Sequence, residues 1–173
     1  AASTADPTID LQSIATAITV NGSTLIAGED LVVDGSSVTG AITATGGAGA
    51  DTLTGGAGND TITGGVGIDA ISGAAGSDVI NGGDGVDTIT FTFETAAADT
   101  LTGGAGNDIF KSATTTAATI TVVEITDFDL GTATTAADVL QLSDTAMTGL
   151  TTTTDMVDTS ANSSGNGEGT VVT

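Results

Sequence analysis

Seven aspartates recur at a regular interval through the middle of the chain, and they are the side chains best suited to chemistry. Each occupies the sixth place of a nonapeptide whose first, second and fourth places are mostly glycine, as in GGAGNDTIT from Gly55 to Thr63. The series is Asp51, Asp60, Asp69, Asp78, Asp87, Asp99 and Asp108. Anionic oxygen in a glycine-rich turn is a suitable ligand for a hard metal cation.

The glycines explain how backbone oxygen could join the carboxylates. Glycine tolerates positive φ and close packing, so six residues can turn tightly with their carbonyl groups facing inward. We therefore predict metal-site roles for the second- and fourth-place glycines Gly47, Gly49, Gly56, Gly58, Gly65, Gly67, Gly76, Gly83, Gly85, Gly104 and Gly106. Calcium accepts about six to eight oxygen ligands at loosely defined geometry. The sequence has no histidine or cysteine to favour a softer metal, so Ca²⁺ is the predicted cofactor.

Short strands are expected to position these turns. The three residues after each aspartate place one apolar side chain between two mostly polar ones, which is typical of a strand with one buried face. The apolar series is Leu53, Ile62, Ile71, Ile80, Ile89, Leu101 and Phe110. A turn and a strand therefore repeat together, which indicates a repeat architecture.

These residues resemble the GGxGxDxUx nonapeptides of the repeats-in-toxin (RTX, hemolysin-type calcium-binding) family, in which U is a large aliphatic residue. The resemblance covers Gly46 to Lys111. Val122 to Asp144 is also similar to the segment that closes the roll in serralysin-type secreted proteases and related exported proteins. The resemblance implies an all-β fold, a right-handed parallel β-roll, in a type I-secreted or surface-layer-like protein. Two nonapeptides would make one coil, with strands alternating between two sheets and calcium between turns two repeats apart.

The alternation divides the aspartates between the two sides of the roll and predicts the number of sites. About four calcium sites follow, from the pairs Asp51/Asp69, Asp69/Asp87, Asp87/Asp108 and Asp60/Asp78. A fifth pair, Asp78/Asp99, is not expected to form a complete site. The segment ETAAAD, from Glu94 to Asp99, lacks the glycines that would aim carbonyl groups inward. Ala74 replaces a second-place glycine, and we expect the turn to tolerate it.

The sequence on either side of the repeats predicts β-rich caps, because a solenoid leaves an open apolar end that must be covered. The predicted organisation is an N-terminal cap over 1–45, the roll over 46–111, a C-terminal cap over 112–150 and a Thr/Ser/Gly-rich tail over 151–173. In the N-terminal cap, Asn21-Gly22 between two apolar runs predicts a hairpin. In the C-terminal cap, strands are predicted over Thr119–Phe128 and Asp138–Leu142.

Asp127 and Asp129 form part of an EF-hand pattern, but the next acidic place is Gly131 and the following glycine is replaced by Thr132. Two interpretations stay open for this pair: a structural role, or an accessory calcium site.

Composition limits the classes of partner that the chain is expected to bind. The net charge is −21, with 22 acidic residues and a single Lys or Arg, so nucleic acid is not an expected partner. No segment approaches the ~18 consecutive apolar residues of a membrane span, so membrane insertion is not expected.

Two other interpretations of the glycine-rich repeats are less favoured. A flexible glycine-rich linker would lack the aliphatic residues that recur in phase with the aspartates. A metal-free β-helix would stack carboxylates that repel one another.

The residue types give little support for catalysis. The sequence has no histidine, cysteine or tyrosine, so the usual acyl-transfer and metalloprotease centres cannot be assembled, and an enzyme is not expected. Three hypotheses remain: a secreted or cell-surface structural protein, the secretion and folding module of a larger exported enzyme or toxin, and an adhesin module. We favour the first, with calcium ions as partners and a homo-oligomer, filament or lattice as its assembled form.

Overall fold

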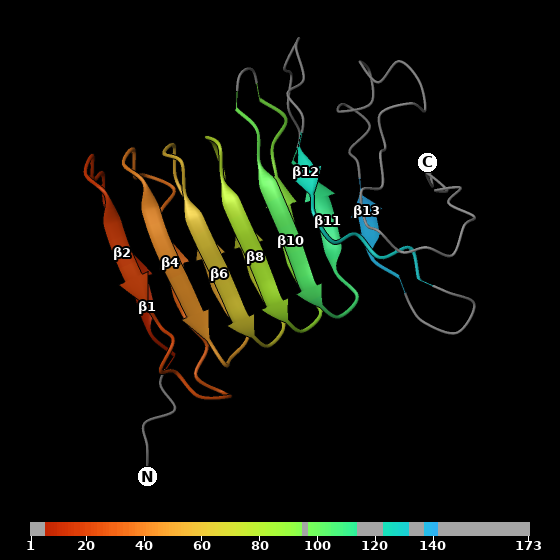
Figure 1. The fold of residues 1–173 in the computed structure, drawn as a ribbon. Helices are drawn as coiled ribbons and strands as arrows, with labels where there is room; N and C mark the ends of the chain where they lie inside the picture. Colours follow the sequence, from red (N-terminus) through yellow and green to blue (C-terminus); the bar gives the residue numbers. More distant parts are fainter. Residues whose placement is uncertain (1–5, 95–96, 114–122, 132–136, 142–173) are drawn as a thin grey trace.

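The computed structural model describes residues 6–94, 97–113, 123–131 and 137–141, which form an all-β parallel solenoid of about five turns. Two sheets lie face to face along its length, one in front of the other in Figure 1. One has the order β1 (Thr8–Asp10), β3 (Val32–Asp34), β5 (Thr52–Thr54), β7 (Ala70–Ser72), β9 (Thr88–Phe91), β11 (Ile109–Ser112) and β13 (Val139–Gln141). The other has the order β12 (Glu124–Ile125), β10 (Thr100–Ala105), β8 (Val79–Asp84), β6 (Thr61–Val66), β4 (Ile42–Gly47) and β2 (Ile18–Asn21).

The predicted alternation of strands between two sheets is confirmed. Every pairing is parallel and joins strands two apart in the chain, so equivalent places of alternate nonapeptides lie side by side. Leu53 pairs with Ile71 in one sheet, and Ile62 pairs with Ile80 in the other. The longer connection before Asp99 keeps this order, because β10 still pairs with β8.

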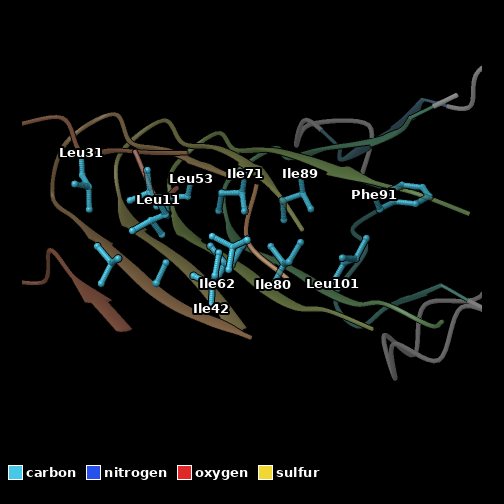
Figure 2. Close-up of a cluster of buried hydrophobic side chains, with 14 of the residues drawn as sticks. Leu11, Leu31, Ile42, Leu53, Ile62, Ile71, Ile80, Ile89, Phe91 and Leu101 are labelled. Carbon is cyan, nitrogen blue, oxygen red and sulfur yellow. The ribbon is translucent and has the colours of Figure 1, made fainter. Parts of the chain in front are cut away.

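The core is a narrow double column of aliphatic side chains between the sheets. Figure 2 shows one column, with Leu53, Ile71 and Ile89, facing a second column from the other sheet. Each eighth-place side chain of the repeats is at most 2% exposed. Burying one such side chain stabilises the fold by about 1.5–3 kcal/mol. Since each nonapeptide buries a single large side chain, the apolar core of each coil is small.

The N-terminal hairpin prediction is wrong. β2 ends at Asn21 and pairs with β4 in parallel, and the following strand, β3, lies in the opposite sheet. The region before residue 46 therefore adds coils to the same solenoid. Parallel stacking buries Val20 beside Ala44 inside the solenoid, and an isolated two-stranded ribbon could not cover both faces of its strands. The Gly22 N–H donates to the Thr45 carbonyl of the next coil, so the turn residue serves the stack.

At the C-terminal end, β12 and β13 lie within the two predicted strand segments and extend the two sheets. Aromatic rings pack here, with Phe110 and Phe128 at a centroid distance of 5.9 Å and Phe91 and Phe93 at 5.3 Å. The predicted tail over 151–173 lies outside the described residues. Within the ranges that are described, no helix has the length and apolar character needed to span a bilayer.

Candidate metal centre

The structure brings the predicted aspartates together in two rows along the turns. The first row contains Asp51, Asp69, Asp87 and Asp108; the second contains Asp60, Asp78 and Asp99. All seven side chains are at most 5% exposed. Burial of this many carboxylates requires a compensating interaction at each one.

Part of the compensation in the first row is a ladder of hydrogen bonds between coils. The N–H of Asp51 donates to Oδ1 of Asp69 at 2.8 Å, and the N–H of Asp69 donates to Oδ1 of Asp87 at 2.9 Å. Asp87 donates in the same way to Asp108, at 2.9 Å. At the N-terminal end, the apolar residue Leu31 donates its N–H to Oδ1 of Asp51 at 2.7 Å. Each carboxylate therefore reaches back to the preceding coil with one oxygen.

The second row repeats this ladder. Asp60 donates its N–H to Oδ1 of Asp78 at 2.9 Å, and Asp78 donates to Oδ1 of Asp99 at 3.0 Å. Ile42 begins this row by donating to Oδ1 of Asp60 at 2.7 Å. The two rows thus separate the predicted pairs as the alternation requires.

The second carboxylate oxygen distinguishes the rows. Oδ2 is buried without a hydrogen-bond partner in all four aspartates of the first row and in no other described side chain. In the second row, Oδ2 of Asp60 accepts the N–H of Gly56 at 2.8 Å. Leaving a buried polar group unpaired costs about 1–3 kcal/mol, and more for a charged group. The first row therefore presents four buried anionic oxygens that lack a donor.

Backbone carbonyls converge on the same gaps between coils. A side chain on Gly46 would collide with Oδ2 of Asp51 and with the carbonyl oxygen of Gly64, so both oxygens lie against the Gly46 α carbon. In the opposite direction, the carbonyl of Gly47 points at Gly65 of the next coil. The first-place and second-place glycines thus direct oxygen into the gap from both coils.

The remaining repeats of the first row have the same arrangement. Gly65, Gly83 and Gly104 have φ of 127°, 114° and 104°, a region that side chains rarely adopt. The fourth-place carbonyls of Gly49 and Gly67 point at the equivalent glycines of the next coil in the same way. Glycine is therefore required twice over at these places, for the dihedral angle and for the close approach of the next carbonyl.

These donors fit calcium. Each gap of the first row combines carboxylate oxygens with backbone carbonyl oxygens, the ligand types that Ca²⁺ prefers. No three His, Cys, Asp or Glu side chains of the described residues come together as a metal-binding group. A bound cation would consequently take its other ligands from the glycine carbonyls. When bound, calcium would neutralise the carboxylates and link consecutive coils.

Burial also shifts the protonation of these groups. The pKa of Asp69 and that of Asp87 are raised to about 6, mainly by burial; the N–H of the preceding aspartate opposes this shift, and repulsion from neighbouring carboxylates adds to it. The pKa of Asp78 is raised to about 7, mainly by burial; the N–H of Asp60 opposes the shift, and repulsion from Asp99, Asp60 and Glu94 adds to it. A divalent cation beside these carboxylates would favour their charged form.

The gap between Asp78 and Asp99 differs from the others, as the loss of glycines predicts. A side chain on Gly55 would meet the carbonyl of Gly73, whereas the atoms nearest to the same place on Gly73 all belong to Asp78. The carboxylate of Glu94 enters this region and accepts the N–H of Gly76 at 3.2 Å. This gap is thus built around a further carboxylate and not around the glycine carbonyl.

Ala74, the substituted second-place residue of this turn, adopts φ of 69°. Its carbonyl accepts a hydrogen bond from the Thr92 hydroxyl at 2.7 Å. The chain therefore keeps the left-handed turn without glycine, at a cost of about 1–2 kcal/mol.

Sequence analysis missed Asp138 as a member of the first row. Oδ1 of Asp138 accepts the N–H of Asp108 at 2.8 Å, in the same way that each aspartate of the repeats serves its predecessor. The signal was present in Ala137 to Gln141 (ADVLQ), which matches the second half of a nonapeptide such as ADTLT. It was obscured because the preceding residues lack the glycines of the motif.

A parallel solenoid with carboxylates and carbonyls between glycine-rich turns belongs to the class of cation-stabilised β-rolls. Consistent with this class, the sequence model of the RTX calcium-binding nonapeptide repeat, which spans 4 copies, matches residues 43–71, 63–91 and 95–112. The chain therefore contains RTX calcium-binding repeats over this region. Searches of curated proteins and of solved structures returned no match.

Proposed function

We propose that this chain is a calcium-binding extracellular structural protein, of the surface-layer, matrix or filament type, whose roll folds on binding calcium. The observation that carries the proposal is the first row, with four buried carboxylate oxygens that have no hydrogen-bond donor. The chain cannot supply the missing positive charge, since it has a single Lys or Arg against 22 acidic residues. Calcium from outside the chain supplies it.

The energetics support a folding switch. Without a cation, the stacked carboxylates repel, and the small apolar layer of each coil does little to offset the chain entropy lost on folding. Each site at tenfold excess of calcium over its dissociation constant stabilises the folded state by roughly 1.4 kcal/mol. Coils contact only their neighbours, so these contributions add along the stack.

The switch also suits export. Extracellular calcium modules bind with dissociation constants of about 10⁻⁴–10⁻³ M. Such sites stay empty at submicromolar calcium inside a cell and fill at millimolar calcium outside. The chain would then cross the envelope unfolded and fold at its destination, in keeping with the type I secretion typical of RTX proteins.

Circular dichroism tests the proposal. The far-ultraviolet spectrum should be that of a largely unfolded chain in chelator and should become a β spectrum on addition of 1–10 mM calcium, a range set by about tenfold excess over the expected dissociation constants. Magnesium at equal concentration is the control and should have much less effect, because it prefers a stricter octahedral geometry. A folded spectrum in chelator at neutral pH would overturn the proposal.

The structural role also predicts self-association in calcium. Apolar side chains are exposed on the turns of the first row, including Val66, Ile68 and Val86, and neutralising nearby carboxylates lowers the repulsion between copies. Light scattering should show assembly that requires calcium and reverses with chelator. A monomer at high protein concentration and millimolar calcium would instead favour the second candidate, a non-enzymatic secretion and folding module of a larger exported enzyme or toxin. Binding in a glycan array would favour the adhesin alternative.

A further inference from the structure

Most of the large apolar side chains that stay exposed gather on one edge of the roll. Among the described residues seven such side chains are exposed, and five of them lie on connections that lead from the six-stranded sheet to the seven-stranded sheet. These turns follow the arrowheads of β4, β6, β8 and β10 along the lower edge of Figure 1. We call them the first-row edge, because the first row of aspartates lies in them. The five side chains are Ile26, Val66, Ile68, Val86 and Leu130.

The folding of a single coil does not require these apolar residues. Two repeats have asparagine at the fifth place, Asn59 and Asn107, where two repeats of the edge have Ile68 and Val86. Ile68 is 67% exposed and Val86 is 44% exposed, and Val66 at a third place is 53% exposed. The glycines set the turn and the eighth-place residue supplies the core, so these side chains have no partner role within the coil.

Backbone bonds between coils make the edge a firm surface with a regular spacing. The N–H of Gly67 donates to the Asp84 carbonyl at 2.8 Å, and the N–H of Gly85 donates to the Ala105 carbonyl at 2.7 Å. Stacked turns are thereby held at the strand spacing of about 4.8 Å. Clustered apolar side chains on such a surface mark an interaction site, and a preorganised surface loses little conformational entropy on binding.

Charge limits where a second copy of this chain can approach. The net charge is −21, so two copies repel over most of their surface. In the four turns that hold the first row, Asp84 is the only exposed carboxylate. Asp69 and Asp87 directly follow Ile68 and Val86 in the chain, so a divalent cation at these carboxylates would remove negative charge beside the apolar side chains.

The best apolar complement to this edge within the described residues is the same edge of a second copy. The two other exposed large apolar side chains, Val79 and Val139, lie singly on β8 and β13, in different sheets. A second copy also has turns at the same spacing, so the two rows of side chains can interdigitate along their length. A patch that meets the same patch of another copy makes an isologous contact, which closes as a pair.

We propose that two copies of the calcium-bound roll pair edge to edge, with Val66, Ile68 and Val86 at the centre of the contact. This pairing rests on the proposed structural function and names its first contact: a closed pair, to which a filament or lattice must add through another surface. The edge is roughly 20–25 Å long. Its area is below the ~1,200 Å² of a standard interface, so the pair should be weak and concentration-dependent.

Sedimentation equilibrium in saturating calcium tests the pairing, at protein concentrations from about 10 µM to about 1 mM, where contacts of this size populate a pair. The average mass of the wild type should rise to at least twice that of one chain. The double variant Ile68→Asn, Val86→Asn should associate at least ~tenfold more weakly, because apolar contact is lost on both copies. It should keep its calcium-induced β spectrum, since asparagine already stands at this place in two repeats.

Val79→Thr is the matched control. It removes an exposed valine from β8, where the neighbours in register, Thr61 and Thr100, are threonines. It should associate like the wild type, and an equal loss in this variant would overturn the assignment to the first-row edge.

The outcomes separate this pairing from the proposed function. A double variant that folds in calcium and associates as strongly as the wild type overturns the edge contact and leaves a structural role standing. A wild type that stays monomeric at every concentration overturns the pairing, while circular dichroism still decides calcium-dependent folding by itself. If the double variant does not fold, Ile68→Asn alone decides: weaker association supports the edge contact, and unchanged association refutes it.

Discussion

Protons should replace calcium in folding the roll, because the buried aspartates favour their neutral form when no cation is bound. The pKa of Asp69 and Asp87 is raised from 3.8 to about 6, and that of Asp78 to about 7, with burial as the largest cause. A folded-state pKa above the unfolded value means that the folded chain binds more protons. Its stabilising contribution is therefore complete below pH 3.8 and is lost as the pH rises through about 6 to 7.

The size of the effect follows from these shifts. At pH 5, linkage gives roughly 1.4 kcal/mol for a group with a folded pKa of about 6 and ~2.7 kcal/mol for one of about 7; at pH 7.5 both fall below ~0.5 kcal/mol. Water that reaches the turns weakens the shifts, so we take about half of the sum, or ~3 kcal/mol for three aspartates. That is a large fraction of the stability of a small domain, which is about 5–15 kcal/mol.

Circular dichroism and urea denaturation in chelator, at pH 7.5 and at pH 5, measure this difference. β structure should increase at pH 5 without any metal. The double variant Asp69→Asn, Asp87→Asn is the control, because the amide resembles a protonated carboxyl group. In Asp69→Asn the amide nitrogen would lie beside the Gly82 carbonyl and could donate to it. The double variant should be more stable than the wild type in chelator at pH 7.5, and its stability should depend less on pH. Equal β content of the wild type at both pH values would refute the reasoning.

Two matched pairs of substitutions, measured by urea denaturation in saturating calcium, test the turns and the core. Gly83→Ala should destabilise the roll by about 1–3 kcal/mol more than Gly28→Ala. Both glycines have positive φ, but only a side chain at Gly83 would collide with a backbone carbonyl, that of Gly65. Equal losses of stability in the two variants would mean that the coils are not tightly stacked. Ile71→Ala should cost about 2–5 kcal/mol because Ile71 is 2% exposed, whereas Ile68→Ala at 67% exposure should change stability by less than ~0.5 kcal/mol. Similar losses for the two isoleucines would place the core elsewhere.

The repeating part of the fold could be predicted from sequence because every nonapeptide contains the residues that determine both its turn and its strand. Glycine fixes the turn, and one apolar residue fixes the inner face of the strand that follows. The spacing between Asp69 and Asp87 then determines which turns stack, and the observed ladder follows it. An insertion did not disturb this order, since the aspartate and the apolar residue after it, Asp99 and Leu101, stayed in phase.

The parts that could not be predicted depend on pairing between distant residues. Asn21-Gly22 has the local chemistry of a hairpin turn, but the strand before it gains more by stacking on the next coil, where Val20 is buried beside Ala44. Local turn propensity does not include the stabilisation that comes from packing against a distant coil. Asp138 was likewise assigned only to a strand, because its relation to Asp108 appears only once β13 is placed beside β11.

The two ends of the first row show how the fold divides its interior between apolar and ionic stabilisation. At the N-terminal end, the place of the aspartate is taken by Leu31, whose side chain is buried and whose N–H satisfies Oδ1 of Asp51. The coils before the repeats thus close with apolar packing and need no cation at that place. From Asp51 onward, the same place holds a carboxylate with an unpaired oxygen, and packing is limited to one aliphatic side chain in each nonapeptide. Under the proposed function, a bound cation would supply the stabilisation that apolar packing does not provide in the repeats, and the calcium concentration around the chain would set their stability.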